Sequence, residues 1–251
     1  MKHIAARALA LLDFTNLNDD CTTADIDDLC NRAATPHGHV AAVCLFPAFI
    51  ECAKENLAGS QVKIVTVANF PEGESGSQAA AEECSAAISK GADEVDIVIP
   101  WRAVLDGNDG TAASVVKACR KAVPKTNVLK VILETGELND QANIRRAACI
   151  ALDEGADFLK TSTGKVPVNA TPEAATILLE EIAKSGRPVG FKAAGGLRTI
   201  EDAATYLSIA DQIMGEDWAT PETFRFGASS ILNVLLATLD GTAPAATSEG
   251  Y

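Results

Sequence analysis

The chain has 251 residues, of which 47% are hydrophobic, and carries a net charge of −13. A chain of this length can bury a large core, and its negative charge excludes nucleic acid as a natural partner, because phosphate backbones are bound by basic faces. No run of about 18 apolar residues occurs, so no membrane span is expected. Seven cysteines without any CxxC spacing indicate neither a disulfide framework nor a zinc site. The simplest compartment for such a chain is the reducing cytoplasm.

Apolar or β-branched runs alternate with helical patterns along most of the chain. The predicted strands are Ala10–Phe14, Val40–Phe46, Val62–Ala68, Glu94–Pro100, Val128–Leu133, Phe158–Thr161, Val189–Ala193 and Phe224–Ala228. The predicted helices are Asp25–Ala34, Ala48–Ala58, Ser77–Lys90, Thr111–Ala122, Asp140–Glu154, Pro172–Lys184, Thr199–Ile209 and Ser230–Leu239. Continuous apolar strands that alternate with helices predict a parallel sheet covered on its faces.

Eight such strand–helix units in about 250 residues predict a (β/α)8 TIM barrel. A doubly wound open sheet is the alternative, although no G-x-G-x-x-G follows the first predicted strand. No linker rich in Pro, Gly or Ser divides the body of the chain. We therefore predict one catalytic barrel domain at 1–239, followed by a short polar tail at 240–251 that is expected to be flexible.

Two lysines stand near the ends of predicted strands, each followed by a glycine-containing exit. Lys160 lies in the run Asp157–Lys165, and Lys192 lies in the run Val189–Gly196. A surface lysine on an edge strand is the alternative for each. Asp96 and Lys130 also occupy nearly continuous apolar runs. Because barrel active sites lie at the carboxyl ends of the strands, one polar cavity that gathers all four residues is the more economical interpretation.

A pair of neighbouring lysines has a specific chemical consequence. A free lysine is less than about 0.1% neutral at pH 7 and is therefore a poor nucleophile. A second ammonium at about 4 Å, with an effective dielectric near 20, adds roughly 4 kcal/mol of repulsion, or about three pKa units. One lysine of the pair would then attack a carbonyl and form a Schiff base. The residues themselves leave open whether Lys160 or Lys192 is the nucleophile.

Glycine-rich turns before the last two predicted helices indicate a phosphate site. A helix N-terminus offers N–H groups and a positive dipole end, and the loops after strands seven and eight of barrels commonly bind phosphate. A simple helix start is the alternative for each turn. The candidate substrate and phosphate ligands are Lys130, Thr163, Gly164, Lys165, Gly195, Gly196, Arg198, Gly227, Ser229 and Ser230.

Metal chemistry is not expected from the distribution of histidines. His3, His37 and His39 all lie in the first 39 residues, and His37-Gly38-His39 reads better as a polar turn than as a metal site. With no later histidine, a Ser-His-Asp triad or a histidine-rich metal centre is hard to build. We predict no metal and no cofactor, and acid–base work falls to Lys, Asp, Glu, Tyr or water.

Motifs over nearly the whole chain carry a family resemblance: Leu12–Thr15, Val43–Pro47, Ala92–Asp96, Glu134–Leu138, Lys160–Lys165, Gly190–Lys192 and Arg225–Ser230. Through them the sequence resembles the deoxyribose-phosphate aldolases, class I aldolases of bacterial type. The resemblance implies reversible cleavage of 2-deoxy-D-ribose 5-phosphate to D-glyceraldehyde 3-phosphate and acetaldehyde, in the breakdown of deoxyribose phosphates. The implied partners are phosphosugar and aldehyde substrates, and a homodimer is possible.

The same resemblance implies roles for single residues. Lys160 would be the Schiff-base lysine, Lys192 the neighbouring cation that lowers its pKa, and Asp96 the group that manages protons through an ordered water. The C-terminal Tyr251 would visit the pocket and assist proton exchange at the imine's α-carbon. Cys44 would lie near the pocket, although a buried small hydrophobe is an equally good interpretation.

Three positions depart from the family pattern: Ala193, Trp101 and Leu197. They flank the site and put rate and substrate breadth in question rather than activity. Two alternatives to the aldolase remain at this stage. A transaldolase-like barrel also uses a lysine but transfers a larger ketose fragment. A catalytically silent phosphosugar-binding barrel predicts the loss of Lys160, Lys192 or Asp96, and all three are present.

Overall fold

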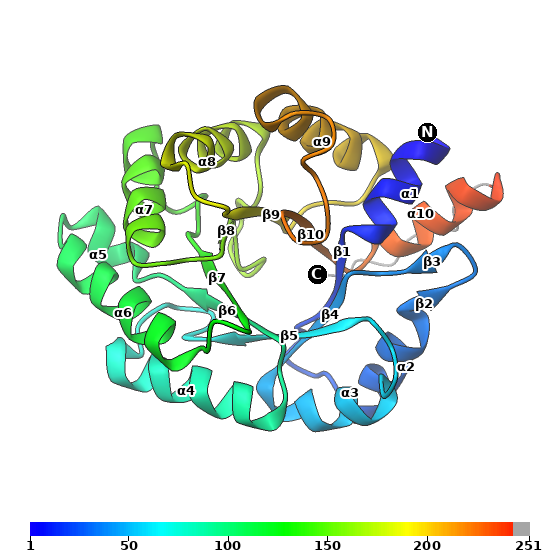
Figure 1. Ribbon diagram of the computed structural model, residues 1–251, viewed down its shortest axis with the longest axis horizontal. Helices are drawn as coiled ribbons and strands as arrows, with labels where there is room; N and C mark the ends of the chain where they lie inside the picture. Colours follow the sequence, from blue (N-terminus) through cyan, green and yellow to red (C-terminus); the bar gives the residue numbers. More distant parts are fainter. Residues whose placement is uncertain (243–251) are drawn as a thin grey trace.

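The computed structural model describes residues 1–242, and in this part of the chain the strands close into a parallel barrel (Figure 1). Around the barrel the order is β1-β10-β9-β8-β7-β6-β5-β4, and β1 pairs with both β10 and β4. The strands of the barrel are β1 (Leu12–Asn16), β4 (Ala42–Leu45), β5 (Lys63–Ala68), β6 (Glu94–Val98), β7 (Val128–Ile132), β8 (Phe158–Lys160), β9 (Gly190–Ala194) and β10 (Phe224–Ala228). The predicted (β/α)8 barrel is confirmed, and closure rules out the open sheet.

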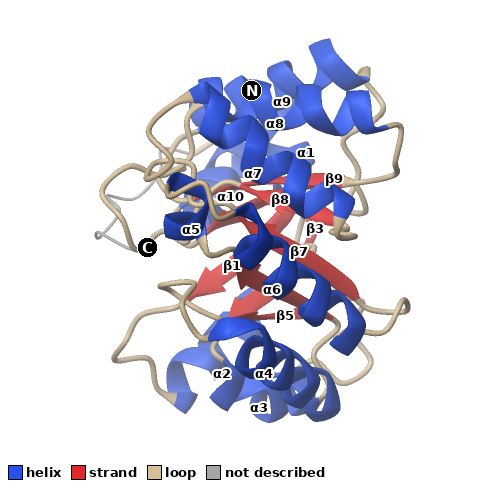
Figure 2. Cartoon of the chain, turned by 90° about the vertical axis from the view of Figure 1, so that its left-hand side faces the viewer, coloured by secondary structure: helices blue, strands red, loops and turns tan. Residues whose placement is uncertain are grey.

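Helices surround the barrel, so that the strands lie between helical layers when it is seen from the side (Figures 1 and 2). They are α1 (Lys2–Ala10), α2 (Thr23–Arg32), the 3-10 helix η1 (Pro47–Phe49), α3 (Ile50–Asn56), α4 (Gly76–Lys90), α5 (Trp101–Leu105), α6 (Asp109–Ala122), α7 (Gln141–Asp153), α8 (Pro172–Ser185), α9 (Ile200–Met214) and α10 (Ile231–Asp240). Side chains cap several N-termini; Thr199, for example, accepts the N–H of Asp202. The main apolar core fills the space between helices and strands.

The N-terminal segment is a helix that the sequence analysis missed. Ala10, predicted to begin the first strand, is the last residue of α1, and β1 begins at Leu12. Ala5, Ala8 and Leu9 are buried, and this spacing of three and four residues is that of one helix face. The face is short and alanine-rich, so its apolar signal is weak. It nevertheless packs α1 beside α10 and α9 at the seam where the barrel closes.

Two short strands, β2 (Ala34–Thr35) and β3 (Gly38–His39), form an antiparallel pair outside the barrel. The predicted polar turn at His37-Gly38-His39 is part of this pair, and His37 Nε2 lies 2.7 Å from Asp240 Oδ1. The hairpin therefore contacts the end of α10.

The last described helix, α10, ends at Asp240 and is followed by Gly241 in a left-handed conformation (φ +76°). Residues 243–251 of the predicted tail lie outside the described residues, and the division into a 1–239 domain and a 240–251 tail stays a prediction. Between Met1 and Thr242, no helix is both long enough and apolar enough to span a membrane.

Candidate active site

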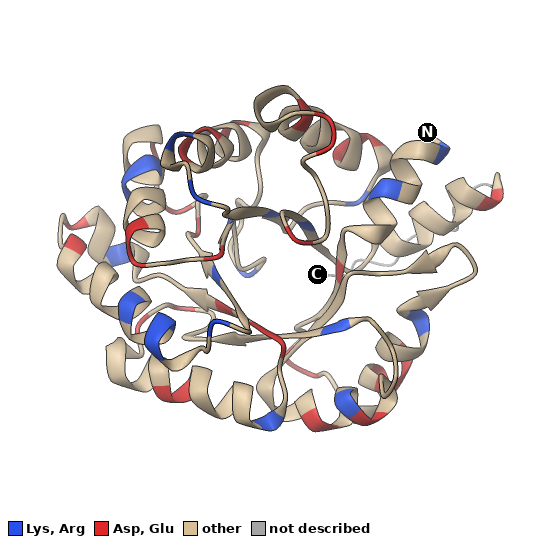
Figure 3. Cartoon of the chain, viewed as in Figure 1, with Lys and Arg blue, Asp and Glu red and all other residues tan. Residues whose placement is uncertain are grey.

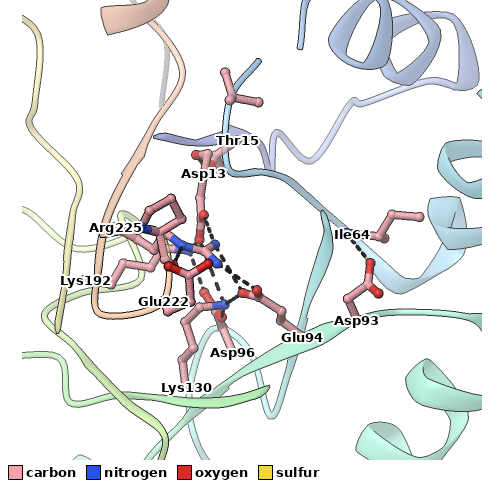
Figure 4. Close-up of polar contacts among 12 residues, drawn as sticks. Asp13, Thr15, Ile64, Asp93, Glu94, Asp96, Lys130, Lys192, Glu222 and Arg225 are labelled. Atoms are coloured by element: carbon pink, nitrogen blue, oxygen red, sulfur yellow. Dashed lines mark hydrogen bonds and ion pairs between the residues drawn. The ribbon is translucent and has the colours of Figure 1, made fainter. Parts of the chain in front are cut away.

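Charged side chains from several strands converge inside the barrel, where Figure 4 draws most of them. We call seven of these residues the inner cluster: Asp13 (β1), Glu94 and Asp96 (β6), Lys130 (β7), Lys160 (β8), Lys192 (β9) and Arg225 (β10). Each is at most 4% exposed. Strand register accounts for their meeting, because Lys160 is the Cα partner of Lys192 and Lys192 is the Cα partner of Arg225. Partners in adjacent strands point to the same face of a sheet. Figure 3 shows how charged positions occur on these inner strands as well as on the outer helices.

Asp96 is the centre of the inner cluster. Its Oδ2 accepts hydrogen bonds from Lys160 Nζ at 3.0 Å and from Lys192 Nζ at 2.9 Å. Its other oxygen, Oδ1, accepts from Lys130 Nζ at 3.0 Å. One carboxylate is thus shared by three lysines. The sequence analysis predicted that these four residues meet in one place, and they do, but it did not predict how they share Asp96.

Two further carboxylates hold the lysines from the other side. Asp13 Oδ2 accepts from Lys192 Nζ at 2.5 Å, and Asp13 Oδ1 accepts from Arg225 at 2.6 Å. Glu94 pairs with Lys130 and, at 2.9 Å, with Arg225. Lys130 and Lys192 therefore each contact at least two carboxylates. Within the described chain, Lys160 has a single ion-pair partner, Asp96.

This difference in partners gives the three lysines different pKa values. Burial lowers the pKa of Lys160; the nearby Asp96 opposes the shift, Lys192 adds to it, and the net pKa is below the ordinary value. Burial would also lower the pKa of Lys192, but Asp13 and Asp96 raise it above the ordinary value. The pKa of Lys130 is also raised above its ordinary value, because Asp96 and Glu94 outweigh the effect of burial. Lys160 is therefore the lysine that most readily gives a neutral amine, a choice that the residues alone had left open.

The main cause of the lowered pKa of Lys160 is not the one that was predicted. The sequence analysis attributed the shift to repulsion between two ammonium groups. In the structure burial is the largest cause, and the charge of Lys192 is a smaller one that is opposed by Asp96. Burial alone would raise the pKa of Asp96, but three lysines hold it well below the ordinary value. It is therefore a carboxylate at neutral pH.

Asp13, Glu94 and Arg225 were not assigned any role from the sequence. Their positions fell inside predicted strands or quoted motifs, but a charged residue in a strand can face either side. One signal was available: Glu94 lies two residues before Asp96, and strand side chains with this spacing share a face. Asp13 and Arg225 meet only because β1 pairs with β10 at the closure of the barrel.

A further buried carboxyl organises the loop that follows Lys160. Glu134 lies after β7 in a left-handed conformation (φ +56°) and is almost fully buried. It accepts the backbone N–H of Thr163 at 3.1 Å and the Thr163 hydroxyl at 2.5 Å. Thr163 Oγ1 in turn accepts the backbone N–H of Lys165 at 3.0 Å. Burial raises the pKa of Glu134, and its hydrogen bonds from Thr163 oppose that shift.

The predicted phosphate loops follow β8, β9 and β10, at the same end of the barrel. Gly164, Gly195 and Gly196 adopt left-handed φ values of +87°, +81° and +82°, which side-chain-bearing residues rarely take. Not every predicted donor is open, because the backbone N–H of Arg198 is donated to the Asp202 carboxylate at 2.9 Å.

The start of α10 offers a hydroxyl to this end of the barrel. Ser230 caps the helix without a side-chain cap bond, and its buried Oγ has no hydrogen-bond partner in residues 1–242. Ser229 lies beside it and is partly buried. The predicted role of both serines as phosphate ligands stays a prediction.

Three other predicted ligands have defined surroundings. A Cβ added at Gly227 would lie 2.9 Å from Lys192 Cε, so this glycine gives Lys192 its space. Lys165 Nζ donates to the exposed Asp19 at 3.0 Å, across the loop that follows β1. Lys130 is fully buried within the inner cluster. Their assignment as substrate ligands stays a prediction.

Comparison with known proteins identifies the family of this chain. Residues 7–237 match the sequence profile of the DeoC/LacD family aldolases. The chain belongs to this family. It is 50% identical over its full length to a protein named deoxyribose-phosphate aldolase from Agrobacterium fabrum (strain C58 / ATCC 33970), covering 97% of that protein.

Solved structures give the same fold. A crystal structure from Toxoplasma gondii ME49 matches with a TM-score of 0.88 and 25% identity, over 96% of each chain. The tetrameric deoxyribose phosphate aldolase from Aeropyrum pernix matches with a TM-score of 0.74 and 24% identity, over 94% of this chain and 91% of that one. The resemblance inferred from the motifs is confirmed, and this chain is an aldolase-family enzyme.

The remaining predicted positions of this aldolase are placed as follows. Cys44, on β4, is fully buried, and burial raises the pKa of its thiol. The charges of Lys192, Asp96 and Lys160 also act on it, so it lies beside the inner cluster and is a buried small side chain at once. Tyr251 lies outside the described residues.

The three departures from the family pattern are all buried. Ala193 lies on β9 and belongs to the main apolar core, and Leu197 lies in the loop before α9. The Trp101 ring begins α5, with the guanidinium carbon of Arg102 3.9 Å from its centroid. None of them replaces a member of the inner cluster.

Proposed function

We propose that this aldolase cleaves 2-deoxy-D-ribose 5-phosphate reversibly to D-glyceraldehyde 3-phosphate and acetaldehyde, through a Schiff base on Lys160. The observation that carries the proposal is the position of Lys160: a buried amine with a lowered pKa, whose one ion-pair partner within residues 1–242 is shared with two other lysines. The substrate is supported by the name of the Agrobacterium fabrum relative, at 50% identity over the full chain.

The reaction begins when neutral Lys160 Nζ adds to the C1 aldehyde of the open sugar. Loss of water gives a protonated imine, which is an electron sink. A base then takes the proton of the C3 hydroxyl, the C2–C3 bond breaks, and its electron pair forms an enamine while glyceraldehyde 3-phosphate leaves. The enamine takes up a proton at C2, and hydrolysis of the resulting imine releases acetaldehyde and regenerates Lys160.

Proton movement in this scheme falls to the groups beside the amine. Asp96 is ionised and its Oδ2 lies 3.0 Å from Lys160 Nζ, so it is placed to exchange protons with the reacting atoms through a water. Lys192, held protonated by Asp13 and Asp96, stabilises negative charge that develops on substrate oxygens. We assign the substrate phosphate to the loops after β8, β9 and β10.

Tyr251 is proposed to assist proton exchange at the α-carbon of the imine. The phenol can donate and accept a proton, and no histidine follows His39 in the sequence. Tyr251→Phe should reduce deuterium incorporation into acetaldehyde while leaving imine formation on Lys160 nearly intact. Wild-type exchange in the variant would remove Tyr251 from the mechanism.

Borohydride trapping tests the proposal directly. The protein is incubated with acetaldehyde, or with deoxyribose 5-phosphate, reduced with borohydride and mapped by peptide mass spectrometry. We expect a reduced adduct on Lys160 and none in Lys160→Met. An adduct confined to Lys192 would reverse the assignment of the nucleophile, and no adduct in the wild-type protein would contradict the Schiff-base mechanism. Release of acetaldehyde from deoxyribose 5-phosphate alone distinguishes this reaction from a transaldolase reaction, which transfers a larger fragment.

The steps as written require no metal and no cofactor, so EDTA-treated protein should keep its full activity, and loss of activity with chelator would contradict this. All seven cysteines are free, which is consistent with the cytoplasmic location that we propose. The predicted homodimer stays a prediction; light scattering on the purified protein would test it.

A further inference from the structure

We propose that Arg225 and Glu94 are positioning residues that set the charge balance of the inner cluster and so leave Lys160 as its one unmatched cation. The inference rests on the proposed Schiff-base function. Neither residue contacts Lys160 through a hydrogen bond or ion pair in the described chain, so both act through other members of the cluster.

Arg225 is the far end of a chain of contacts that leads to Lys160. It is buried on β10, and its two terminal nitrogens hold Asp13 at 2.6 Å and Glu94 at 2.9 Å, while its Nε donates to the Pro221 carbonyl at 2.5 Å. In Figure 4 the guanidinium lies between these two carboxylates. From Asp13 the contacts continue through Lys192 to Asp96.

A count of charges explains why this distant residue matters. The carboxylates of the inner cluster are Asp13, Glu94 and Asp96, and its cations are Lys130, Lys160, Lys192 and Arg225. At the charges that these groups carry in water at neutral pH, three negative groups face four positive ones. A buried cluster favours neutrality, because an uncompensated charge in the interior costs several kcal/mol. Loss of one proton from one of the four cations would make the cluster neutral.

The geometry selects which cation that is. Arg225 cannot deprotonate in a protein, and it engages Asp13 and Glu94. Lys130 and Lys192 each contact two carboxylates or more, whereas Lys160, among the residues that the structure describes, pairs only with the shared Asp96. Because Arg225 neutralises part of Asp13 and Glu94, these carboxylates cannot compensate Lys160 as well. The lowered pKa of Lys160 agrees with this position.

Other ionisable groups also act on Lys160 from neighbouring elements. They are the Cys44 thiol on β4 and the Glu134 carboxyl after β7, in addition to Asp96 and Lys192. Cys44 and Glu134 are unchanged in the variants proposed below, so their influence is common to every pH profile that is compared.

Single substitutions of the two residues should shift the pKa of Lys160 in opposite directions. Arg225→Met removes a positive charge, so the pKa of Lys160 rises. The midpoint of the pH profile for imine formation then moves to higher pH. Glu94→Gln removes a negative charge, so the profile moves to lower pH. A unit charge acting through an interior with an effective dielectric near 20 gives a shift of about one pH unit. The double variant restores the balance and should return toward the wild-type profile.

The measurement is the rate of borohydride-trapped adduct at Lys160, with acetaldehyde, from pH 5 to 10. Acetaldehyde lacks the phosphate and the sugar hydroxyls, so substrate binding in the loops does not enter. Arg225→Lys is the matched control: it keeps the charge but not the two-pronged contact, and its profile should keep the wild-type midpoint even if its stability falls. Circular dichroism checks that each variant is folded, and Arg225→Gln replaces Arg225→Met if the latter does not fold.

Opposite shifts in the two single variants, with recovery in the double variant, would support the inference. Unshifted profiles, or shifts in the same direction, would overturn it, because a purely structural role has no reason to follow the sign of the removed charge. Absence of any adduct in the wild-type protein is a separate result: it would contradict the proposed function itself.

Discussion

The inner cluster and the loops after β8, β9 and β10 lie at the same site but are built in different ways. Every member of the inner cluster is buried on a strand and fixed by ion pairs to its neighbours. The loops instead present left-handed glycines and exposed residues such as Gly196 and Arg198. The ion pairs that surround Lys160 therefore belong to the folded barrel itself and do not depend on a bound substrate. Recognition of the phosphosugar, as we propose it, would depend instead on the loops, where Gly196 and Arg198 are exposed.

The largest expected effect comes from breaking the cluster at its centre. Asp96→Asn leaves three buried ammonium groups without their shared carboxylate, and we expect a loss of about 3–5 kcal/mol in the free energy of unfolding. Urea titration measures it. The control is Asp28→Asn, which removes an exposed (i, i+4) ion pair with Arg32 and should cost less than about 1 kcal/mol. Equal losses in the two variants would show that the cluster is not electrostatically coupled.

Removing the neighbouring cation should change the chemistry more than the fold. The charge of Lys192 contributes to the lowered pKa of Lys160, so Lys192→Met should raise that pKa and reduce the neutral amine at pH 7. Because the neutral fraction falls about tenfold per pKa unit, imine formation at pH 7 should slow by roughly ten- to a hundredfold and recover as the pH rises. Lys63→Met, at the exposed start of β5, is the control. An unchanged pH profile would mean that Lys192 does not act on Lys160 through its charge.

The loops should be sensitive to charge in a substrate-specific way. Ser229→Glu places a negative group at the proposed phosphate site, so kcat/KM for deoxyribose 5-phosphate should fall by about tenfold or more through like-charge repulsion. Unphosphorylated deoxyribose should be affected much less. Ser208→Glu, on an exposed position of α9, should change neither value. Equal losses with both sugars would place the phosphate elsewhere.

The smallest effect is expected where the two regions join. Glu134 accepts a hydrogen bond from the Thr163 hydroxyl, so the Thr163 oxygen faces other groups as an acceptor. Glu134→Gln offers an N–H instead and lets the hydroxyl turn its proton outward. We expect KM for deoxyribose 5-phosphate to rise a few-fold, the size of one altered hydrogen bond. Acetaldehyde trapping at Lys160 should change less, because the largest influences on the pKa of Lys160 are burial, Asp96 and Lys192. A larger effect on trapping than on KM would move Glu134 from the loop to the cluster.

The sequence predicted the parts of this molecule that repeat. Eight strand–helix units predicted the barrel, and the similar exits after Lys160 and Lys192 predicted one shared site. It did not reveal α1, whose apolar face consists of little more than Ala5, Ala8 and Leu9. It also did not assign Asp13 and Arg225, because their contact depends on how the first and last strands meet. Periodicity describes one strand or helix at a time, and closure is a property of the whole chain.

The contact between Asp13 and Arg225 joins residues 212 positions apart in the sequence, across the strands where the barrel closes. A chain emerging from the ribosome carries the first of these residues long before the second. Until β10 takes its place, Asp13 lacks one of its two strongest partners, and burying it is costly. Closing the ring and completing the catalytic electrostatics are thus one event, and it comes last in synthesis. We therefore expect a nascent chain that stops short of β10 to have neither a closed barrel nor activity.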